Sequence, residues 1–364
     1  MRVSILCPLV IATIACFFVS QPVHAEVYGL NPGPVELNSI GPMTFGPSNV
    51  LFVGDTKAAK VYAINTEDSG KASADYAIED VSGKIASALG VDRVSVGDMA
   101  VNPETGHVFV GVNAGGKGHL VRVAPDGTVT KLNMDKIGHA VAVMPNPPED
   151  KVVGRGRRAK NQRNESITDI AYTDGRVLVS GLTTGDSPSA VREFDFPFRE
   201  SSEGMQVQFY HAAHGQEENT PAIQTFVPFN VGGEASVLAG FTCTPLVKFP
   251  IAKIGDDAKV QGTTVAELGN RNKPFDMIVY EQEGKPYLLM ANSSRGVMKI
   301  STEGLEQNEG LTKPVRGGGI AGQTFETIES LKDVVQLDKS DDTHAIVMVQ
   351  PRGGSAMLKT ITLP

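Results

Sequence analysis

Two histidines three residues apart form the clearest metal-binding pattern in the sequence. His211 and His214 stand in the segment HAAHGQEEN, where Glu217 adds a carboxylate. A spacing of i, i+3 places both imidazoles on one side of a helical turn. Cys243 is expected at the same end of the molecule, and a His/His/Cys set suits zinc or copper. The alternative is a pair of solvated loop histidines and one buried cysteine.

Four aspartates recur, each followed by two apolar residues. They are Asp98, Asp169, Asp276 and Asp333. In a structural role, each carboxylate at the head of a strand would accept backbone N–H groups from a loop or a neighbouring unit. In a functional role, the carboxylates would form a ring that binds a divalent cation such as calcium. Without a cation, crowded carboxylates raise one another's pKa.

Basic and amide side chains gather in the polar loops that connect the apolar strands. Six lysines and arginines occur between Lys151 and Arg163, although the chain is acidic overall. Guanidinium groups bind carboxylates and phosphates, so these loops are candidates for an anionic substrate, a glycan carboxylate or an acidic protein partner. The alternative for the basic run is a solvated, protease-sensitive loop. The ligand-binding candidates are Arg157, Arg158, Arg271, Asn292, Arg295 and Arg352.

The elements that must position these residues are copies of one strand, which occurs six times in the sequence. Each copy is almost continuously apolar, as a strand buried on both faces should be. A hairpin turn joins it to a preceding strand, and a short polar loop joins it to a following one. Further outer strands are expected at 127–132, 204–210 and 259–267. The six copies begin at Asn49, His107, Arg176, Ala235, Pro286 and His344.

A four-stranded antiparallel unit repeated six times predicts an all-β, six-bladed β-propeller. One blade cannot bury both of its faces, so neighbouring blades and ring closure supply the core. The chain ends after the third strand of the last repeat, and we expect the N-terminal stretch 27–38 to complete that blade and close the ring. A seven-bladed ring is the alternative, with a degenerate blade in the long 133–166 connection.

Strand alternation places the candidate residues at one end of the propeller. Loops that lead into the innermost strands and loops that follow the second strands lie together at this end, which we call the mouth face. Exposed loops on a rigid scaffold are where binding and catalysis usually occur. The sequence therefore predicts one functional face.

The N-terminus has the pattern of a secretory signal. Arg2 precedes an apolar stretch over 5–19, and Val23-His24-Ala25 suits cleavage before Glu26. We expect a signal peptide over 1–25 and a single propeller domain over 26–364, exported to the periplasm or secreted. The apolar stretch is short for a membrane span. Lipid attachment at Cys16 is the alternative processing route.

Charge, cysteine count and missing motifs argue against several classes of partner, cofactor and catalytic site. The formal net charge is −8, which disfavours nucleic acid as a partner. Signal cleavage would leave Cys243 as the one cysteine, so an intramolecular disulfide is not expected. We also expect a monomer. No Cys-x-x-Cys-His motif, Gly-x-Ser-x-Gly motif or Walker-type phosphate-binding loop occurs in the sequence.

The repeats resemble those of the NHL/YVTN and gluconolactonase-type propellers. The likeness spans nearly all of 40–364 and depends on generic motifs such as Gly-Asp-Met-Ala-Val at 97–101. Gluconolactonase-type enzymes begin with a Glu-Gly-Pro-x-Trp metal-ligand motif. The nearest match, Ile40-Gly41-Pro42-Met43, lacks both the Glu and the Trp. The resemblance implies the fold but not that family's ligands or activity.

Two functions fit these expectations. The first is a propeller that binds a small molecule, a glycan or a protein on the mouth face without catalysis. The second is a hydrolase or lyase whose divalent metal (calcium, zinc or copper) polarises a carbonyl or activates water at the axial mouth. Propellers host both kinds of function, so the fold does not separate them. The lack of a complete catalytic constellation favours binding.

Overall fold

The computed structural model of the chain describes residues 28–156, 159–199, 204–254 and 259–364. The expected signal segment 1–25 and the basic candidates Arg157 and Arg158 lie outside these residues. Within the described ranges, no helix is long and apolar enough to cross a membrane.

The recurring apolar strands form the middle strands of antiparallel sheets. Their side chains are buried on both faces; Leu51, Phe52 and Val53 of the first copy are 0% exposed. Branched and aromatic side chains favour this pleated, two-sided packing. The middle strands are β3 (Val50–Asp55), β7 (Val108–Ala114), β14 (Arg176–Leu182), β19 (Glu234–Phe241), β23 (Lys285–Asn292) and β28 (His344–Val349).

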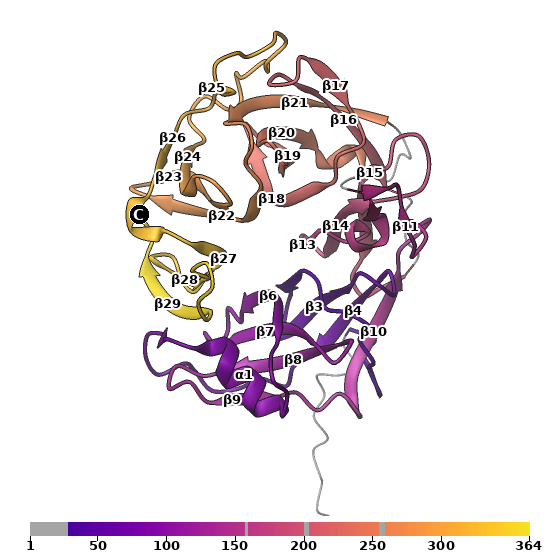
Figure 1. The fold of residues 1–364 in the computed structure, drawn as a ribbon, viewed down its shortest axis with the longest axis vertical. Helices are drawn as coiled ribbons and strands as arrows, with labels where there is room; N and C mark the ends of the chain where they lie inside the picture. Colours follow the sequence, from indigo (N-terminus) through magenta and orange to yellow (C-terminus); the bar gives the residue numbers. More distant parts are fainter. Residues whose placement is uncertain (1–27, 157–158, 200–203, 255–258) are drawn as a thin grey trace, which may run out of the picture.

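Each middle strand lies between an innermost strand and a third strand, and the innermost strands surround a central axis (Figure 1). The fold is therefore an all-β propeller, as the sequence predicts. The innermost strands are β2 (Met43–Phe45), β6 (Ser95–Val101), β13 (Asp169–Thr173), β18 (Ile223–Val231), β22 (Pro274–Gln282) and β27 (Val334–Lys339). The third strands are β4 (Lys60–Asn65), β8 (Lys117–Val123), β15 (Ser189–Asp195), β20 (Pro245–Pro250), β24 (Gly296–Ser301) and β29 (Met357–Thr362).

The order of the blades around the ring departs from their order in the chain. We name each blade by its innermost strand. The β6 blade contacts the β27 and β2 blades, and the β2 blade contacts the β6 and β13 blades. From β13 onward, neighbours in the ring are neighbours in the sequence. The first two blades are therefore exchanged relative to a sequential propeller.

The outer strands account for this exchange. After β4 the chain crosses to the last blade, where β5 (Ala77–Ile78) pairs with β29 before the chain enters β6. Later, β10 (Ile137–Val143) returns to pair with β4, and β1 (Asn31–Gly33) pairs with β10. An N-terminal strand closes the ring as expected, but that strand is β5. The segment 27–38, which we expected there, instead supplies β1 to the outside of the β2 blade. A strand of two or three residues carries too little pattern to show which sheet edge it joins.

The 133–166 connection, where a degenerate blade was the alternative, has other roles. Its first part forms β10, and β11 (Val152–Val153) pairs with β12 (Lys160–Asn161) in a two-stranded ribbon. The 3-10 helix η2 (Gln162–Glu165) leads toward β13. Apart from 157–158, this connection is described, and that part contains no further four-stranded sheet.

Backbone pairing also joins two neighbouring blades directly. The outer strand β16 (Met205–His211) of the β13 blade pairs in parallel with β21 (Lys259–Leu268) of the β18 blade. Hairpin strand β17 (Gln216–Glu218) folds back on β16, and β25 (Ile320–Gly322) pairs with β21. The three outer strands predicted from the sequence are therefore present. The remaining outer strands are β9 (Val129–Lys131) and β26 (Phe325–Thr327).

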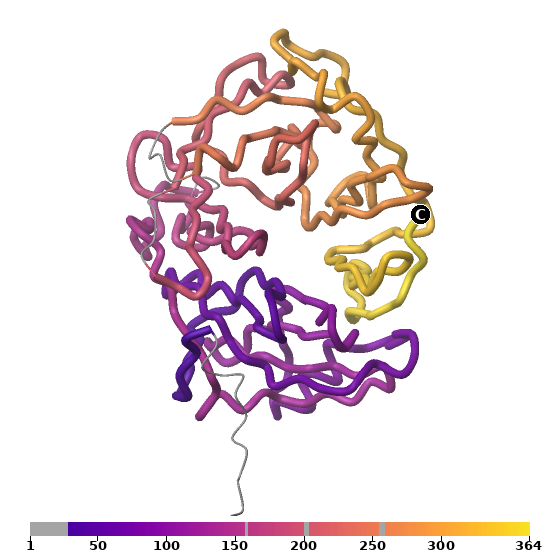
Figure 2. Tube along the Cα trace, turned by 180° about the vertical axis from the view of Figure 1, so that it is seen from behind, coloured from indigo at the N-terminus to yellow at the C-terminus, as the bar shows by residue number. Residues whose placement is uncertain are grey.

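The hydrophobic core lies mainly between blades, as ring closure requires. One cluster combines side chains of the β6 and β27 blades with helix α1 (Val81–Leu89), whose Val81 and Ile85 are fully buried. Figure 2 shows from behind that the C-terminal blade (yellow) lies beside this part of the ring. Helix α1 is not predicted from the repeat pattern, although Asp80 caps its start and Gly90 ends it at φ 69°. Two short 3-10 helices are η3 (Ile251–Lys253) and η4 (Glu329–Leu331).

Candidate functional site

Three of the four predicted aspartates lie on innermost strands and bind the backbone of a neighbouring blade. Each carboxylate accepts the N–H of the residue that follows it and one N–H of the next innermost strand. The bonds between blades join Asp98 to Met43 N (2.6 Å), Asp169 to Phe226 N (2.7 Å) and Asp276 to Leu337 N (2.8 Å). These contacts support the structural reading of the recurring aspartate.

The fourth such carboxylate belongs to Asp338, which the sequence alignment missed. It accepts the N–H of Val101 on β6 at 2.8 Å. Asp333, the predicted member, precedes β27 with φ 61° and is exposed on the mouth face. The motif Asp-Val-Val at 333 imitates the aligned pattern, but it begins before β27. The residue that follows the bulge, where β6 has Asp98 and β22 has Asp276, is Gln336 in β27, and Asp338 lies two residues further along. We call Asp98, Asp169, Asp276 and Asp338 the axial carboxylates.

The four bonds between blades run in one sense around the ring. They lead from β6 to β2, from β13 to β18, from β22 to β27 and from β27 to β6. The described residues contain one group of three or more His, Cys, Asp or Glu whose ligand atoms lie within 4.8 Å of one another. None of the axial carboxylates belongs to this group, so they do not converge on a shared cation position.

Two cavities meet at the axial carboxylates. A cavity of about 440 Å³ on the mouth side and one of about 280 Å³ on the opposite side are both lined by Asp98, Asp169 and Asp276. Burial raises the pKa of Asp169 to about 7 and that of Asp338 to about 6. Burial also raises the pKa of Asp98 and Asp276 well above the usual range, and nearby axial carboxylates add to both shifts.

These raised pKa values predict how stability depends on pH. Between about pH 4 and pH 7 the folded chain holds protons on Asp169 and Asp338 that the unfolded chain releases, so stability falls as the pH rises through this window. We expect a loss of about 1–2 kcal/mol, because the half-buried carboxylates are partly screened at the cavity wall. Urea unfolding of the wild type at several pH values measures this slope.

The matched variant carries Asp169→Asn and Asp338→Asn. Amides do not titrate, so its unfolding free energy should depend less steeply on pH over the same window. Asp75→Asn, an exposed aspartate outside the ring, should keep the wild-type slope. Equal slopes in all three proteins would show that the axial carboxylates are already ionised at pH 4.

A separate cavity of about 900 Å³ lies on the mouth face between the β22 and β27 blades. It is lined by three of the predicted ligand-binding residues, Asn292, Arg295 and Arg352. The buried Asn292 ends β23, and its Oδ1 accepts the N–H of Arg295 at 2.9 Å. Both residues line this cavity, and the guanidinium of Arg295 also packs against Gly269. We call this space the mouth-face cavity.

Arg271 and Cys243 lie beside each other on neighbouring loops of the mouth face. Both have left-handed backbones, with φ 57° for Arg271 and φ 67° for Cys243. Cys243 N–H donates to the carbonyl of Asn272 at 2.7 Å, and the Ser294 hydroxyl donates to the carbonyl of Arg271 at 3.0 Å. These bonds confirm that the loops before innermost strands meet the loops that follow middle strands. Cys243 is not part of the group of converging ligand atoms.

That group consists of His211, His214 and Glu218, and it could hold a metal ion. The Nδ1 atoms of His211 and His214 lie 2.9 and 2.7 Å from the two carboxylate oxygens of Glu218. The sequence pattern favours Glu217 as the third ligand. In β17, however, Glu217 pairs outward with Gln261, whereas Glu218 turns toward the histidines. Strand alternation across this hairpin is the signal that distinguishes them.

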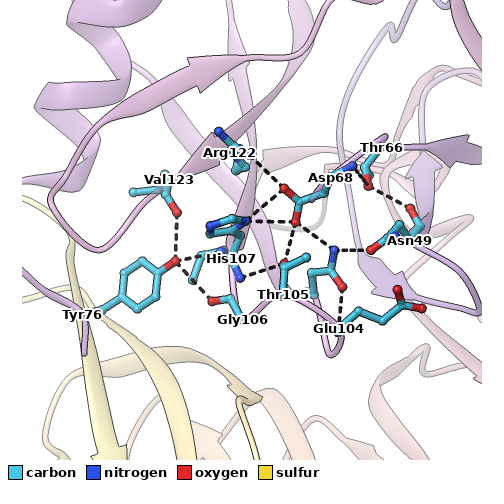
Figure 3. A network of polar contacts seen from close by, with 12 residues as sticks. Asn49, Thr66, Asp68, Tyr76, Glu104, Thr105, Gly106, His107, Arg122 and Val123 are labelled. Carbon is cyan, nitrogen blue, oxygen red and sulfur yellow. Dashed lines mark hydrogen bonds and ion pairs between the residues drawn. The ribbon is translucent and has the colours of Figure 1, made fainter. Parts of the chain in front are cut away.

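Sequence reasoning also missed a buried polar network at the opposite end of the molecule (Figure 3). Asp68, whose side chain is 0% exposed, follows β4 and reaches the turn between β6 and β7. The network ties the β2 blade to the β6 blade. The donors around the carboxylate are Asn102 Nδ2 (2.9 Å), Thr105 Oγ1 (2.5 Å), His107 Nδ1 (3.0 Å) and Arg122 Nη1 (2.9 Å).

Comparisons with known proteins reveal similarity in fold only. No family model matches the chain, and no curated protein matches its sequence. Among solved structures, the chain is similar to hydrazine synthase from Kuenenia stuttgartiensis, with a TM-score of 0.42, 13% identity, and 94% of this chain and 99% of that chain covered. It is also similar to the PQQ-bound aldose sugar dehydrogenase of Streptomyces coelicolor (TM-score 0.34, 10% identity, coverage 91% and 96%) and to a luciferin-regenerating enzyme (0.29, 10%, 92% and 96%).

Proposed function

We propose that the protein is an exported propeller that binds a small polar ligand with an anionic group in the mouth-face cavity. Two buried donors beside this cavity carry the proposal. Nδ2 of Asn292 and Nε of Arg295 have no hydrogen-bond partner among the described residues. A buried donor without a partner costs about 1–3 kcal/mol, so a ligand that accepts both bonds regains this energy. Export is proposed from the secretory pattern of 1–25.

The charges around the cavity define the ligand further. Arg295, Lys332 and Arg352 supply positive charge, and the exposed Glu329 and Asp333 lie on the same wall. A polyanion would meet both acids, whereas one carboxylate or phosphate could pair with the guanidinium groups. Hydroxyl groups elsewhere on the ligand could donate to the two acids. An acidic monosaccharide combines these features.

The cavity also offers an apolar surface. Phe275 is 37% exposed and lines both the mouth-face cavity and the axial cavity, as do Val335 and Gln350. The carbon-bound face of a sugar ring could pack on this aromatic side chain, as apolar groups generally do on exposed rings. The ligand would then extend from Arg295 toward the axis.

Removing both guanidinium groups should abolish selective binding. We expect the double variant Arg295→Ala, Arg352→Ala to bind glucuronate or glucose 6-phosphate at least tenfold more weakly than the wild type, because each charge-assisted hydrogen bond contributes about 1.5–3 kcal/mol. Isothermal titration with these two probes, and with glucose as the neutral comparison, measures the difference.

Arg316→Ala is the control, because this exposed arginine lies outside the mouth-face cavity. It should leave affinity unchanged. Equal affinity for glucose and both anionic probes, or binding of the anions that survives the double variant, would rule out the proposed ligand class at this cavity.

The second candidate is a hydrolase or lyase at the axial mouth. One observation favours it: Asp169 lines the axial cavity, and burial raises its pKa to about 7, near the value suited to general acid–base catalysis. Against it, the oxygens of the axial carboxylates already accept backbone N–H groups. A calcium, zinc or copper ion at that mouth would have to compete with these bonds. We therefore rank binding first.

A further inference from the structure

We propose that His211, His214 and Glu218 bind one divalent transition-metal ion of the zinc type at the outer seam between the β13 and β18 blades, and that buried Glu267 positions His211. This site is separate from the mouth-face cavity, since none of its residues lines that cavity. It does not depend on the function proposed above.

A tight hairpin brings the three ligands together. β16 ends at His211, and the N–H groups of His214 and Gly215 donate to the carbonyl of His211 at 3.1 and 2.8 Å. Gly215 adopts φ 68°, which permits the chain to reverse into β17. The centroids of the two imidazole rings lie 3.8 Å apart, and β17 brings Glu218 opposite Phe209.

The donor atoms already converge. Glu218 uses one carboxylate oxygen for Nδ1 of His211 at 2.9 Å and the other for Nδ1 of His214 at 2.7 Å. A cation between these atoms would replace two hydrogen bonds with metal bonds of about 2.0–2.2 Å.

Two buried atoms without hydrogen-bond partners are an independent indication of a metal site. Nε2 of His211 and Oε2 of Glu267 face each other at 3.8 Å, and neither has a hydrogen-bond partner among the described residues. Both residues are almost completely buried, at 1% and 0% exposure. If Nδ1 of His211 binds a metal, Nε2 carries the proton and a small approach completes a bond to Glu267. Metal-bound histidines generally donate their second N–H to a carboxylate in this way.

Glu267 is itself held in place. Its Oε1 accepts the N–H of Ala213, within the turn between the two histidines, at 3.0 Å. Glu267 lies on β21, so the contact joins the hairpin of one blade to the outer strand of the next. Binding a metal at the hairpin would therefore stiffen the parallel β16–β21 seam as well as the hairpin.

The donor set defines the class of metal. Two imidazole nitrogens and one carboxylate suit zinc or copper(II), whereas calcium and magnesium prefer more oxygen ligands. Three protein ligands leave a fourth position of a tetrahedral ion. His214 is exposed on that side, with 47% of its side chain accessible, so water can complete the coordination.

The test titrates zinc into the full chain, produced without a histidine tag and stripped with a chelator. We expect one zinc per chain by competition with a chromophoric chelator, no calcium binding at equal concentration, and a rise in melting temperature with zinc. His214→Ala and Glu218→Gln should each weaken zinc binding at least 100-fold. His119→Ala, on β8 of another blade, is the matched histidine control and should bind zinc like the wild type.

The positioning role of Glu267 must be tested with a measurement that a change in packing alone would not affect. Glu267→Gln should weaken zinc binding by about 10–100-fold, because His211 loses its carboxylate partner, and the conservative Glu267→Asp should restore part of the affinity. His211 is buried, so His211→Ala could misfold and would then be uninformative. The test therefore uses His214→Ala, at an exposed residue, and the isosteric Glu218→Gln.

Absence of zinc binding to the wild type would show that the cluster is a hydrogen-bond network only. Wild-type zinc affinity in both His214→Ala and Glu218→Gln would place the metal elsewhere; either result overturns the proposal.

Discussion

Replacement of Asp68 by alanine should lower the free energy of unfolding by about 3–4 kcal/mol, the largest effect we expect from a single exchange. The substitution removes the acceptor shared by Asn102, Thr105, His107 and Arg122 (Figure 3). Breaking a buried charged pair by deleting one partner typically costs about 3–5 kcal/mol. Arg122 is partly exposed, with 33% of its side chain accessible, so water regains part of this loss.

The same contacts also define the pH range of the effect. Burial raises the pKa of Asp68, but hydrogen bonds from Thr105, Arg122 and His107 outweigh it, so the pKa lies below its usual range. The stability that this carboxylate contributes is therefore present above about pH 4, the unfolded value, and is lost as the pH falls through the folded pKa.

Urea denaturation at pH 7 measures the loss. Asp68→Asn should cost less than Asp68→Ala, because the amide oxygen still accepts some of the bonds. Asp75→Ala, on the exposed surface nearby, should change stability by less than about 0.5 kcal/mol. If Asp68→Ala proved as stable as Asp75→Ala, the network would not hold the β2 and β6 blades together.

The second large effect is expected at Asp276. Its exchange to alanine deprives the N–H groups of Met277 and Leu337 of their acceptor. Each unsatisfied buried donor costs about 1–3 kcal/mol, and relief of repulsion among the axial carboxylates offsets part of this. We expect a net loss of about 2–3 kcal/mol, measured by urea unfolding.

Asp333 provides the matched comparison, because the sequence pattern assigns it the same role and the structure places it on the surface. Asn tolerates the left-handed backbone of this residue, so Asp333→Asn should be nearly neutral. Asp276→Asn keeps one acceptor oxygen and should fall between Asp333→Asn and Asp276→Ala. Equal stability of all three variants would contradict a structural role for the axial carboxylates.

The sequence predicts the propeller because its signals are local. Apolar middle strands such as β3 and β7 are buried on both faces, and this burial leaves a continuous hydrophobic run in the sequence. The exchange of the first two blades leaves no such mark. It depends on β5 and β10, and the partner of a short outer strand is decided by edges that lie far away in the chain.

The positions of the candidate site residues could likewise be predicted only where a local pattern specifies them. Grouping loops by strand direction assigns Asn292, Arg295 and Arg352 to one face, and in the structure all three line one cavity. The alignment on Asp followed by two apolar residues selects Asp333 in place of Asp338, because β27 has Gln336 at the position where β6 and β22 have Asp. Glu267 could not be connected with His211, because their contact crosses a parallel pairing between two blades that no local pattern encodes.

The exchanged blades also constrain the order in which the molecule can assemble. β5 is made early, yet its partner β29 consists of residues near the end of the chain. Until β27, β28 and β29 have been synthesised, the β6 blade has no neighbour on one side, and β5 remains an unpaired edge. Contacts of such large sequence separation slow folding, and open edges favour aggregation. The ring therefore becomes a closed, edge-protected structure only after β29 has been synthesised.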